Sequence, residues 1–185
     1  KHFNILLKEK GMQNLFNLIS QKRFLFLSFG GVLVCMFGFL ALENELGLPI
    51  LDVLPHYDLS AVEQSMVGYG EEGRKLYAWA SLTLDVLFPI CYSCFFGGLM
   101  VLFSGLSPFR WLALLPFGLG FIDVVENIQI CTMLFQYPNI TESQVSVASI
   151  TTSLKHAMVI IVYSLVALQA IYAFIKWVKV HFKGS

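Results

Sequence analysis

The sequence predicts an all-α fold, a bundle of four transmembrane helices with an extramembrane lid segment between the first two. Of its 185 residues, 57% are hydrophobic and only 13% are charged, whereas soluble domains are about half apolar and a quarter charged. Four apolar stretches are long enough for a helix to cross the hydrocarbon core, which takes about 20 residues. No stretch alternates as a strand does, and a spanning chain forms either helices or a closed barrel.

The whole chain, residues 1–185, is predicted to be a single integral membrane domain. Its predicted spans cover residues 24–42, 76–106, 111–135 and 145–178. The first span contains no charge, but ionisable residues interrupt the other three, namely Asp85, Asp123, Glu126, Lys155 and His156. Charge inside a bilayer is costly, so each of these marks a candidate functional residue.

The segments outside the spans are also predicted to be ordered. Residues 1–20 place apolar and basic side chains at helical spacing, which is typical of a helix lying in the membrane interface. Residues 43–75 are too long and too apolar for a plain connection, so we expect them to fold over the outer end of the bundle. Within them, Ser60-Ala61-Val62-Glu63 has the pattern of a capping box that starts a helix over 60–68. Three glycines then end that helix: Gly68, Gly70 and Gly73.

The ends of the later spans carry their own signals. Tyr137-Pro138 ends the third, because the residue before a proline is disfavoured in a helix. Thr141-x-x-Gln144 is a capping box that starts the fourth. Basic residues gather at both termini, which the positive-inside rule places in the cytosol. These residues are Lys1, Lys8, Lys10, Lys22, Arg23, Lys176, Lys179 and Lys183.

The depth of the ionisable groups predicts that they share one level of the bundle. At about 1.5 Å per helical residue, Glu43 lies about 30 Å from Arg23, and Lys155 lies about 31 Å from Lys176. The hydrocarbon core is about 30 Å thick. The groups therefore belong to the outer third of the membrane or to its outer boundary.

The spacing within the third span predicts that its polar residues point in one direction. Asp123, Glu126 and Asn127 stand at i, i+3 and i+4, which is one face of a helix. We therefore expect a polar chamber close to the non-cytosolic surface, into which several helices project. Its predicted ligand-binding residues are Glu43, Asp85, Tyr92, Asp123, Glu126, Asn127, Lys155 and His156.

The chemistry of this chamber favours binding of an amphiphilic ligand. Its acids outnumber its bases, and buried like charges cannot all ionise, so a shared proton, a bound cation or a cationic ligand must offset the excess. Apolar side chains would line the body of the pocket, from Phe88, Tyr92, Phe95, Phe117, Phe121 and Met133. A lipid, a sterol or a lipophilic amine suits such a pocket.

Two alternatives stay open. A membrane enzyme would use Asp85, Glu126 or His156 for acid–base chemistry on a lipid, although no nucleophile motif supports one. A structural or ion- or proton-transporting subunit would use the same charges to fix helix register or to pass ions.

Composition also limits which kinds of partner are expected. A formal net charge of zero leaves no basic footprint for nucleic acid. No cofactor is expected, and a zinc site is not expected because His156 is the only histidine inside a span and the usual ligand set is missing. A hard divalent cation, however, suits the oxygens of Asp123, Glu126 and Asn127. The expected partners are membrane lipids and the ligand. Gly30-Gly31 and Gly97-Gly98 allow close helix contact within the chain or in a homo-oligomer.

Three features of the first hundred residues form a further pattern. The first span ends in Leu42-Glu43-Asn44-Glu45, the outer segment contains Leu51-Asp52-Val53-Leu54-Pro55, and Asp85 shortly precedes Pro89. In these features the chain resembles the EXPERA family of sigma-2 receptor-like four-helix membrane proteins. The resemblance implies an occluded pocket for sterols or cationic amphiphiles, faced by Glu43 (or Glu45) and by Asp85.

Overall fold

The computed structural model describes residues 2–104 and 108–182, with side chains at positions 11–104 and 109–181. Within these ranges the chain is all-helical and contains no strand, as predicted. The five α-helices and two short 3-10 helices are, in order, α1 (His2–Ile19), α2 (Lys22–Leu46), η1 (Leu51–Val53), α3 (Leu59–Ser104), η2 (Pro108–Leu114), α4 (Leu115–Gln136) and α5 (Glu142–Phe182).

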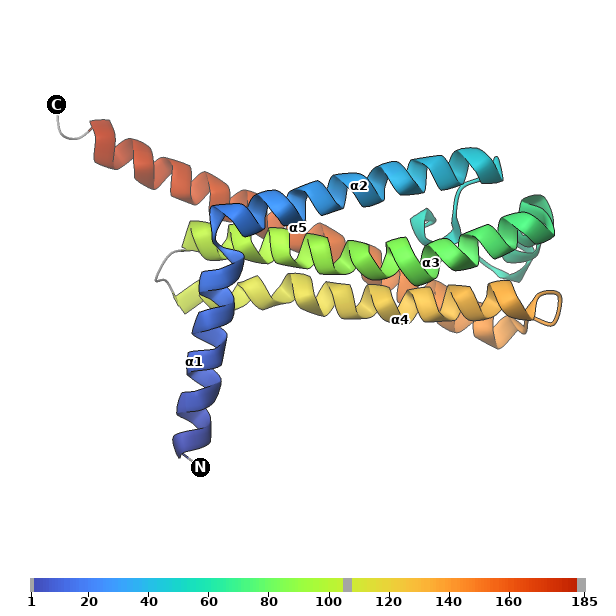
Figure 1. Ribbon diagram of the computed structural model, residues 1–185, viewed down its shortest axis with the longest axis horizontal. Helices are drawn as coiled ribbons and strands as arrows, with labels where there is room; N and C mark the ends of the chain where they lie inside the picture. The colour runs from blue at the N-terminus through green and yellow to red at the C-terminus, as the bar shows by residue number, and fades with distance from the viewer. Residues whose placement is uncertain (1, 105–107, 183–185) are drawn as a thin grey trace.

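Helices α2 to α5 run along one another as an elongated bundle, and α1 turns away from one end of it (Figure 1). Helix α3 packs against α2, α4 and α5, so it is the central helix. We call the end where α1 joins α2 the α1 end. The opposite end, where residues 47–58 connect α2 to α3, is the loop end.

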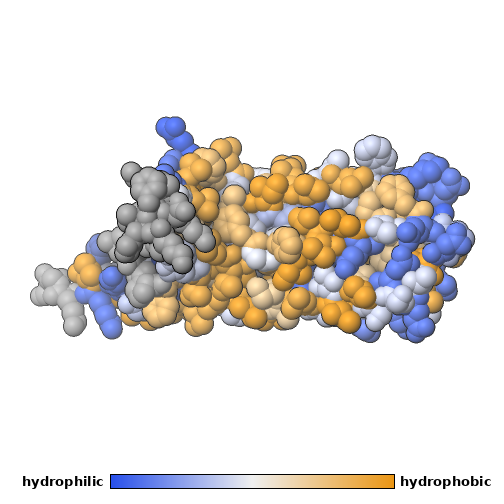
Figure 2. Space-filling view, turned by 90° about the horizontal axis from the view of Figure 1, so that it is seen from below, coloured by the Kyte–Doolittle hydropathy of each residue, from blue (hydrophilic) through white to orange (hydrophobic). Residues whose placement is uncertain are grey.

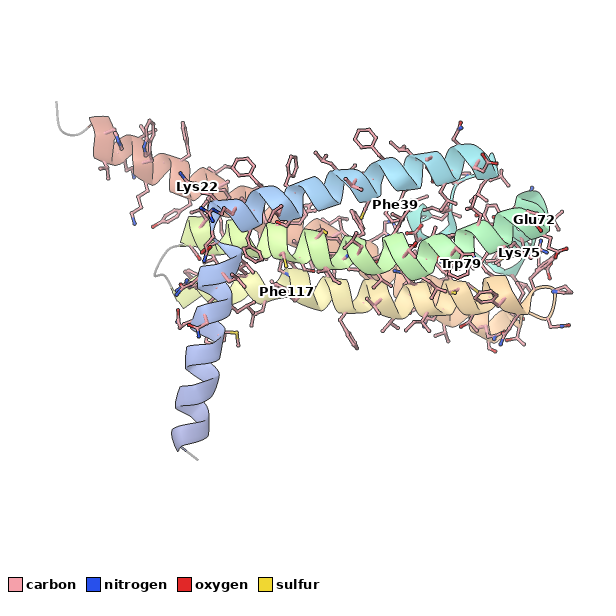
Figure 3. The ribbon with its side chains drawn as sticks, viewed as in Figure 1. Lys22, Phe39, Glu72, Lys75, Trp79 and Phe117 are labelled. Carbon is pink, nitrogen blue, oxygen red and sulfur yellow. The ribbon has the colours of Figure 1, made fainter. Side chains whose placement is uncertain are left out.

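Within the described residues, four helical stretches are long and apolar enough to cross a membrane: Lys22–Leu46, Leu59–Ser104, Phe109–Gln136 and Glu142–His181. Figure 2 shows hydrophobic side chains around the middle of the molecule and hydrophilic ones gathered at the loop end. In Figure 3, Lys22 lies at the α1 end, whereas Glu72 and Lys75 lie at the loop end. So large an exposed apolar surface suits lipid rather than water. This is the make-up of a multi-pass membrane protein.

The second predicted span is the later part of a longer helix. Helix α3 begins at Leu59, so it also includes the short helix predicted over 60–68. The two parts meet at Gly70, whose backbone is not helical (φ 64°, ψ 179°). A positive φ is the conformation that glycine adopts without a steric penalty. A break was therefore correctly predicted in this glycine-rich stretch, but it is a kink inside α3 and does not divide it into two separate helices.

One of the two predicted capping boxes is confirmed and the other is wrong. At the start of α5, the Thr141 N–H donates to Gln144 Oε1 (2.9 Å) and the Gln144 N–H donates to Thr141 Oγ1 (3.3 Å). At the start of α3, Asp58 Oδ1 accepts hydrogen bonds from the Ala61 N–H and the Ser60 hydroxyl, both at 2.8 Å. Asp58 therefore caps α3, because the helix starts before the predicted Ser60-x-x-Glu63 box.

Helix α1 is held against the bundle by a close backbone approach. Phe16 and Ile19, near its end, are buried against α3 and η2. A Cβ atom on Gly98 would collide with the carbonyl oxygen of Ile19, and one on Gly97 would lie 3.0 Å from the Ala113 carbonyl oxygen. The Gly97-Gly98 patch therefore serves contact within the chain. The helix predicted over residues 1–20 is confirmed, and its place in the membrane interface stays a prediction.

Candidate functional site

Residues 47–58 are bound to the bundle by hydrogen bonds to side chains of α3 and α5. The Leu51 N–H donates to the Tyr77 hydroxyl, and the Tyr57 N–H donates to Ser149 Oγ, both at 3.0 Å. The Ser153 hydroxyl donates to the carbonyl oxygen of Pro55 (3.0 Å). An irregular segment needs such partners because its buried backbone groups lack those of a helix. This anchoring fixes η1 against the loop end of the bundle.

Three acids from two elements, η1 and α4, converge on Lys155 of α5. Its Nζ lies 3.5 Å from Asp123 Oδ1, 3.7 Å from Asp52 Oδ2 and closest of all to Glu126 Oε2. Asp123 and Glu126 point the same way from α4 because they stand one helical turn apart. Asp52 comes from η1. We call these four residues the ion cluster.

Hydroxyl groups extend the ion cluster in two directions. The Tyr92 hydroxyl donates to Asp123 Oδ2 (3.0 Å). On the other side, the Thr152 hydroxyl donates to Glu126 Oε1, and the Tyr57 hydroxyl lies 3.1 Å from Thr152 Oγ1. A buried carboxylate that accepts several hydrogen bonds is held in one orientation. The cluster is therefore continuous from residues 47–58, through α5 and α4, to α3.

A second polar contact joins α3 to α4 beside the cluster. The Asn127 side-chain amide donates to the backbone carbonyl of Asp85 (2.8 Å), and both side chains are buried. Asn127 Oδ1 and Asp52 Oδ1 are buried without a hydrogen-bond partner among the described residues. Unpartnered buried polar atoms cost about 1–3 kcal/mol each. These two oxygens are therefore available to a donor that is not part of the chain.

Burial changes the acidity of the groups that residues 47–58 contribute. It raises the pKa of the Asp52 carboxyl, and the opposing attraction of Lys155 does not outweigh this effect. Burial also raises the pKa of the Tyr57 hydroxyl to about 12, so this group stays a hydrogen-bond donor at neutral pH. Burial thus favours the uncharged form of both groups.

A small cavity of about 100 Å³ opens beside the ion cluster. Asp52, Asp123 and Lys155 form its polar end. Apolar and aromatic side chains form the rest of its wall: Phe88, Tyr92, Phe96, Leu119, Val159 and Tyr163. Tyr163 is 53% exposed, so the cavity wall includes a residue of the bundle surface on α5.

Most of the predicted site residues come together, but two do not join the cluster. Asp85, Tyr92, Asp123, Glu126, Asn127 and Lys155 all lie in the cluster or directly beside it. Glu43 instead accepts a hydrogen bond from the Ile50 N–H (3.3 Å), where it fixes the end of α2. The His156 ring lies 2.9 Å from the Thr152 carbonyl oxygen of its own helix. Neither side chain lines the cavity.

The predicted apolar body of the pocket also differs in part. Phe88 and Tyr92 line the cavity as expected, together with Phe96 and Tyr163. The other predicted members, Phe95, Phe117, Phe121 and Met133, lie outside its wall. Phe121 is 71% exposed, because at 3.6 residues per turn it stands on the side of α4 opposite the buried Asp123 and Glu126.

Sequence reasoning assigned no role at the site to Asp52 or Tyr57, both contributed by residues 47–58. One signal could have singled out Asp52, because it is a charged residue inside the apolar run Leu51-Asp52-Val53-Leu54. Such a residue in a long connection is either exposed or paired with a buried base. The buried Leu51 next to it indicates the second case.

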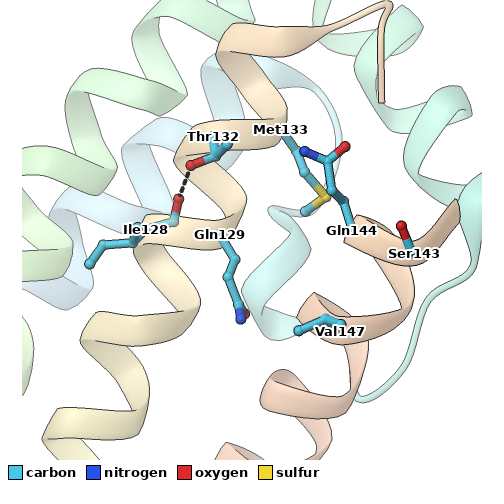
Figure 4. A pocket seen from close by; sticks show the side chains of 7 residues that line it. All are labelled: Ile128, Gln129, Thr132, Met133, Ser143, Gln144 and Val147. Carbon is cyan, nitrogen blue, oxygen red and sulfur yellow. Dashed lines mark hydrogen bonds between the residues drawn. The ribbon is translucent and has the colours of Figure 1, made fainter. Parts of the chain in front are cut away.

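Among the further hollows away from the ion cluster are the following two. One of about 340 Å³ lies between α4 and the start of α5 (Figure 4). Its wall includes Gln129, Met133 and Val147. The other is a groove of about 720 Å³ at the α1 end. In the described part of the chain, no group of three or more His, Cys, Asp or Glu residues is placed to hold a metal ion.

The fold and the site define a class: helical multi-pass membrane proteins in which a buried ion cluster adjoins a small cavity. Comparisons with models of known families, with curated proteins and with solved structures found no match. The resemblance to the EXPERA family therefore stays a prediction, and the function has to be argued from the site.

Proposed function

We propose that the protein binds an amphiphilic, membrane-soluble molecule, with the polar group of the ligand at the ion cluster and its apolar part along the aromatic wall. The observation that carries the proposal is the cavity itself. One end consists of Asp52, Asp123 and Lys155, and the remaining wall is apolar. Pockets for small amphiphiles have this composition, with a few convergent polar groups in an apolar surface.

The excess of acids favours a ligand that carries a positive charge. Asp52, Asp123 and Glu126 share the single positive charge of Lys155. Asp52 Oδ1 has no hydrogen-bond partner among the described residues. An ammonium group brings donors and positive charge, and hydrogen bonds to charged groups contribute about 1.5–3 kcal/mol. A lipophilic amine therefore satisfies this site better than a neutral sterol or lipid.

The size of the cavity limits what it encloses. A volume of about 100 Å³ compares with about 30 Å³ for a water molecule in the liquid. It therefore holds a head group of a few heavy atoms and not a whole lipid. The apolar remainder of the ligand would leave past Val159 and Tyr163, toward the lipid between α3 and α5.

We also propose the orientation. The basic residues near both termini place the α1 end in the cytosol, which puts the ion cluster in the outer third of the membrane. Residues 43–75 then act as a lid over the outer end. Support comes from the hydrogen bonds that tie Leu51 and Tyr57 to α3 and α5.

The alternatives are less well supported by the geometry. A catalytic acid or base must come within hydrogen-bond reach of the reacting group. Asp85, Glu126 and His156 are not among the residues that line the cavity. A transport path would need polar groups toward the α1 end, where the interior is instead filled by buried apolar side chains such as Phe16, Met100 and Val101.

The test is the binding of dodecylamine compared with its neutral analogue dodecanol. Both are titrated against the full chain in lipid nanodiscs by calorimetry, and mass spectrometry identifies what co-purifies. The wild type should bind the amine more tightly, and Asp123→Asn should lose about tenfold in amine affinity. Glu72→Gln, at an exposed acid of the same end, is the matched control. Equal binding of amine and alcohol, or equal effects of the two substitutions, would refute the proposal.

A further inference from the structure

The groove at the α1 end lies far from the ion cluster and is a separate feature. It has a volume of about 720 Å³ and lies between α5 on one side and the end of α3 with η2 on the other. Its wall is mostly apolar, with Leu102, Phe103, Leu112, Leu165 and Leu168. Helix α5 leans away from the bundle toward its C-terminus (Figure 1), which leaves this space open.

Three polar side chains of α5 follow the groove. Gln169, Tyr172 and Lys176 stand at i, i+3 and i+7, which is one face of a helix, and all three line the groove. Both polar atoms of the Gln169 amide are buried without a hydrogen-bond partner within the described residues. Lys176 is exposed and makes no ion pair in the described part of the chain. The groove thus combines an apolar wall, an unsatisfied amide and a free positive charge.

The depth of these groups matches a bilayer boundary. Lys176 follows Lys155 by 21 positions on the same helix, a rise of about 31 Å. The hydrocarbon core is about 30 Å thick, so the two lysines lie at opposite boundaries of it. Gln169 lies about 10 Å deeper than Lys176. The groove therefore opens at the level of lipid head groups and continues into the acyl region.

We propose that this groove binds one anionic phospholipid. Lys176 pairs with the phosphate, the Gln169 amide bonds to an ester carbonyl, and an acyl chain lies along Leu165 and Leu168. Charge complementarity and the apolar wall together favour a phospholipid over a soluble anion, which would leave that wall exposed. The inference does not depend on the ligand proposed for the ion cluster.

Native mass spectrometry of the full chain in detergent tests the proposal, with phosphatidylglycerol and phosphatidylcholine added in parallel. The wild type should bind phosphatidylglycerol about fivefold more tightly, the contribution expected of one lysine near a membrane surface. Lys176→Gln should abolish this preference. Lys179→Gln, an exposed lysine of the same helix that does not line the groove, should leave it unchanged.

A second pair of variants tests the acyl site without altering charge. Leu168→Trp fills the groove, whereas Ile171→Trp places the same bulk on an exposed position outside it. The first should weaken binding of both lipids and the second should not. The proposal is overturned if the wild type binds the two lipids equally, or if Lys176→Gln and Lys179→Gln behave alike. It is also overturned if inorganic phosphate displaces the lipid while Leu168→Trp has no effect, since the site would then bind free phosphate.

Discussion

Replacing Lys155 by methionine removes the charge on which the ion cluster depends while nearly keeping the volume of the side chain. In the wild type, this lysine contacts Asp52, Asp123 and Glu126. Glu126 is fully buried, with an exposed fraction of 0%. The substitution therefore leaves buried acids facing one another without a base.

Two estimates bear on the size of the effect. Polar contacts between membrane helices contribute about 0.6 kcal/mol on average, whereas stranding one partner of a buried ion pair costs about 3–5 kcal/mol. The cost of stranding a buried partner applies here, because the buried Glu126 cannot turn to water. Lys155→Met should therefore lower the free energy of unfolding by about 3–5 kcal/mol.

Thermal unfolding measures this loss. A dye that reacts with thiols reports unfolding when the buried Cys35 and Cys131 become exposed. For a chain of this length, 1 kcal/mol shifts the melting temperature by about 2–4 °C, so Lys155→Met should lower it by about 6–20 °C. Lys75→Met is the control, because Lys75 also pairs with two acids, Glu71 and Glu72, but at an exposed position. It should leave the melting temperature unchanged.

A double substitution separates stranded charge from lost packing. Glu126→Gln, added to Lys155→Met, removes the buried negative charge and should restore part of the melting temperature. If the loss came only from packing, the second change would restore nothing. A stabilising role of the Lys155 charge is refuted if Lys155→Met is no more harmful than Lys75→Met, or if Glu126→Gln makes the double variant less stable.

Two further predictions concern the fold. Gly98→Ala should destabilise the chain by about 1–3 kcal/mol, because the added Cβ meets the backbone of Ile19. Gly30→Ala is the control, because the space around its Cβ is open, and it should be neutral or stabilising in the same melting assay. Hydrogen bonds from the Ala61 N–H and the Ser60 hydroxyl hold the pKa of Asp58 below its ordinary value of 3.8. The carboxylate therefore stabilises α3 above that pH. Asp58→Ala should lower the melting temperature near neutral pH, and the difference should shrink as the pH falls below 3.8; a difference that does not depend on pH would contradict this.

The helices and most of the cluster could be predicted because they depend on local rules. The positions of Asp123, Glu126 and Asn127 follow from helical spacing together with the cost of placing charge against lipid. Lys155 follows from its depth along α5. Spacing and depth do not predict the position of a side chain that bonds to its own helix or to the segment that follows the helix. His156 is close to the carbonyl oxygen of Thr152, and Glu43 bonds to the Ile50 N–H.

Asp52 could not be placed in the same way, because its position depends on contacts between segments distant in sequence. The Tyr77 hydroxyl holds the Leu51 N–H, and Ser149 holds the Tyr57 N–H. Neither contact leaves a periodic signal in the sequence. The ion cluster therefore contains one acid from outside the spans, Asp52, whereas helical spacing predicts only the members that lie within the spans.

This origin of Asp52 bears on how the proposed ligand would enter. A route through the loop end would have to separate Asp52 from Lys155 and detach residues 47–58 from α3 and α5. A route between α3 and α5 passes the half-exposed Tyr163 and leaves those contacts intact. The second route costs fewer interactions, and it begins in lipid, where an amphiphile is concentrated. Residues 47–58 would then serve to hold Asp52 in the cavity wall and not to open for each ligand.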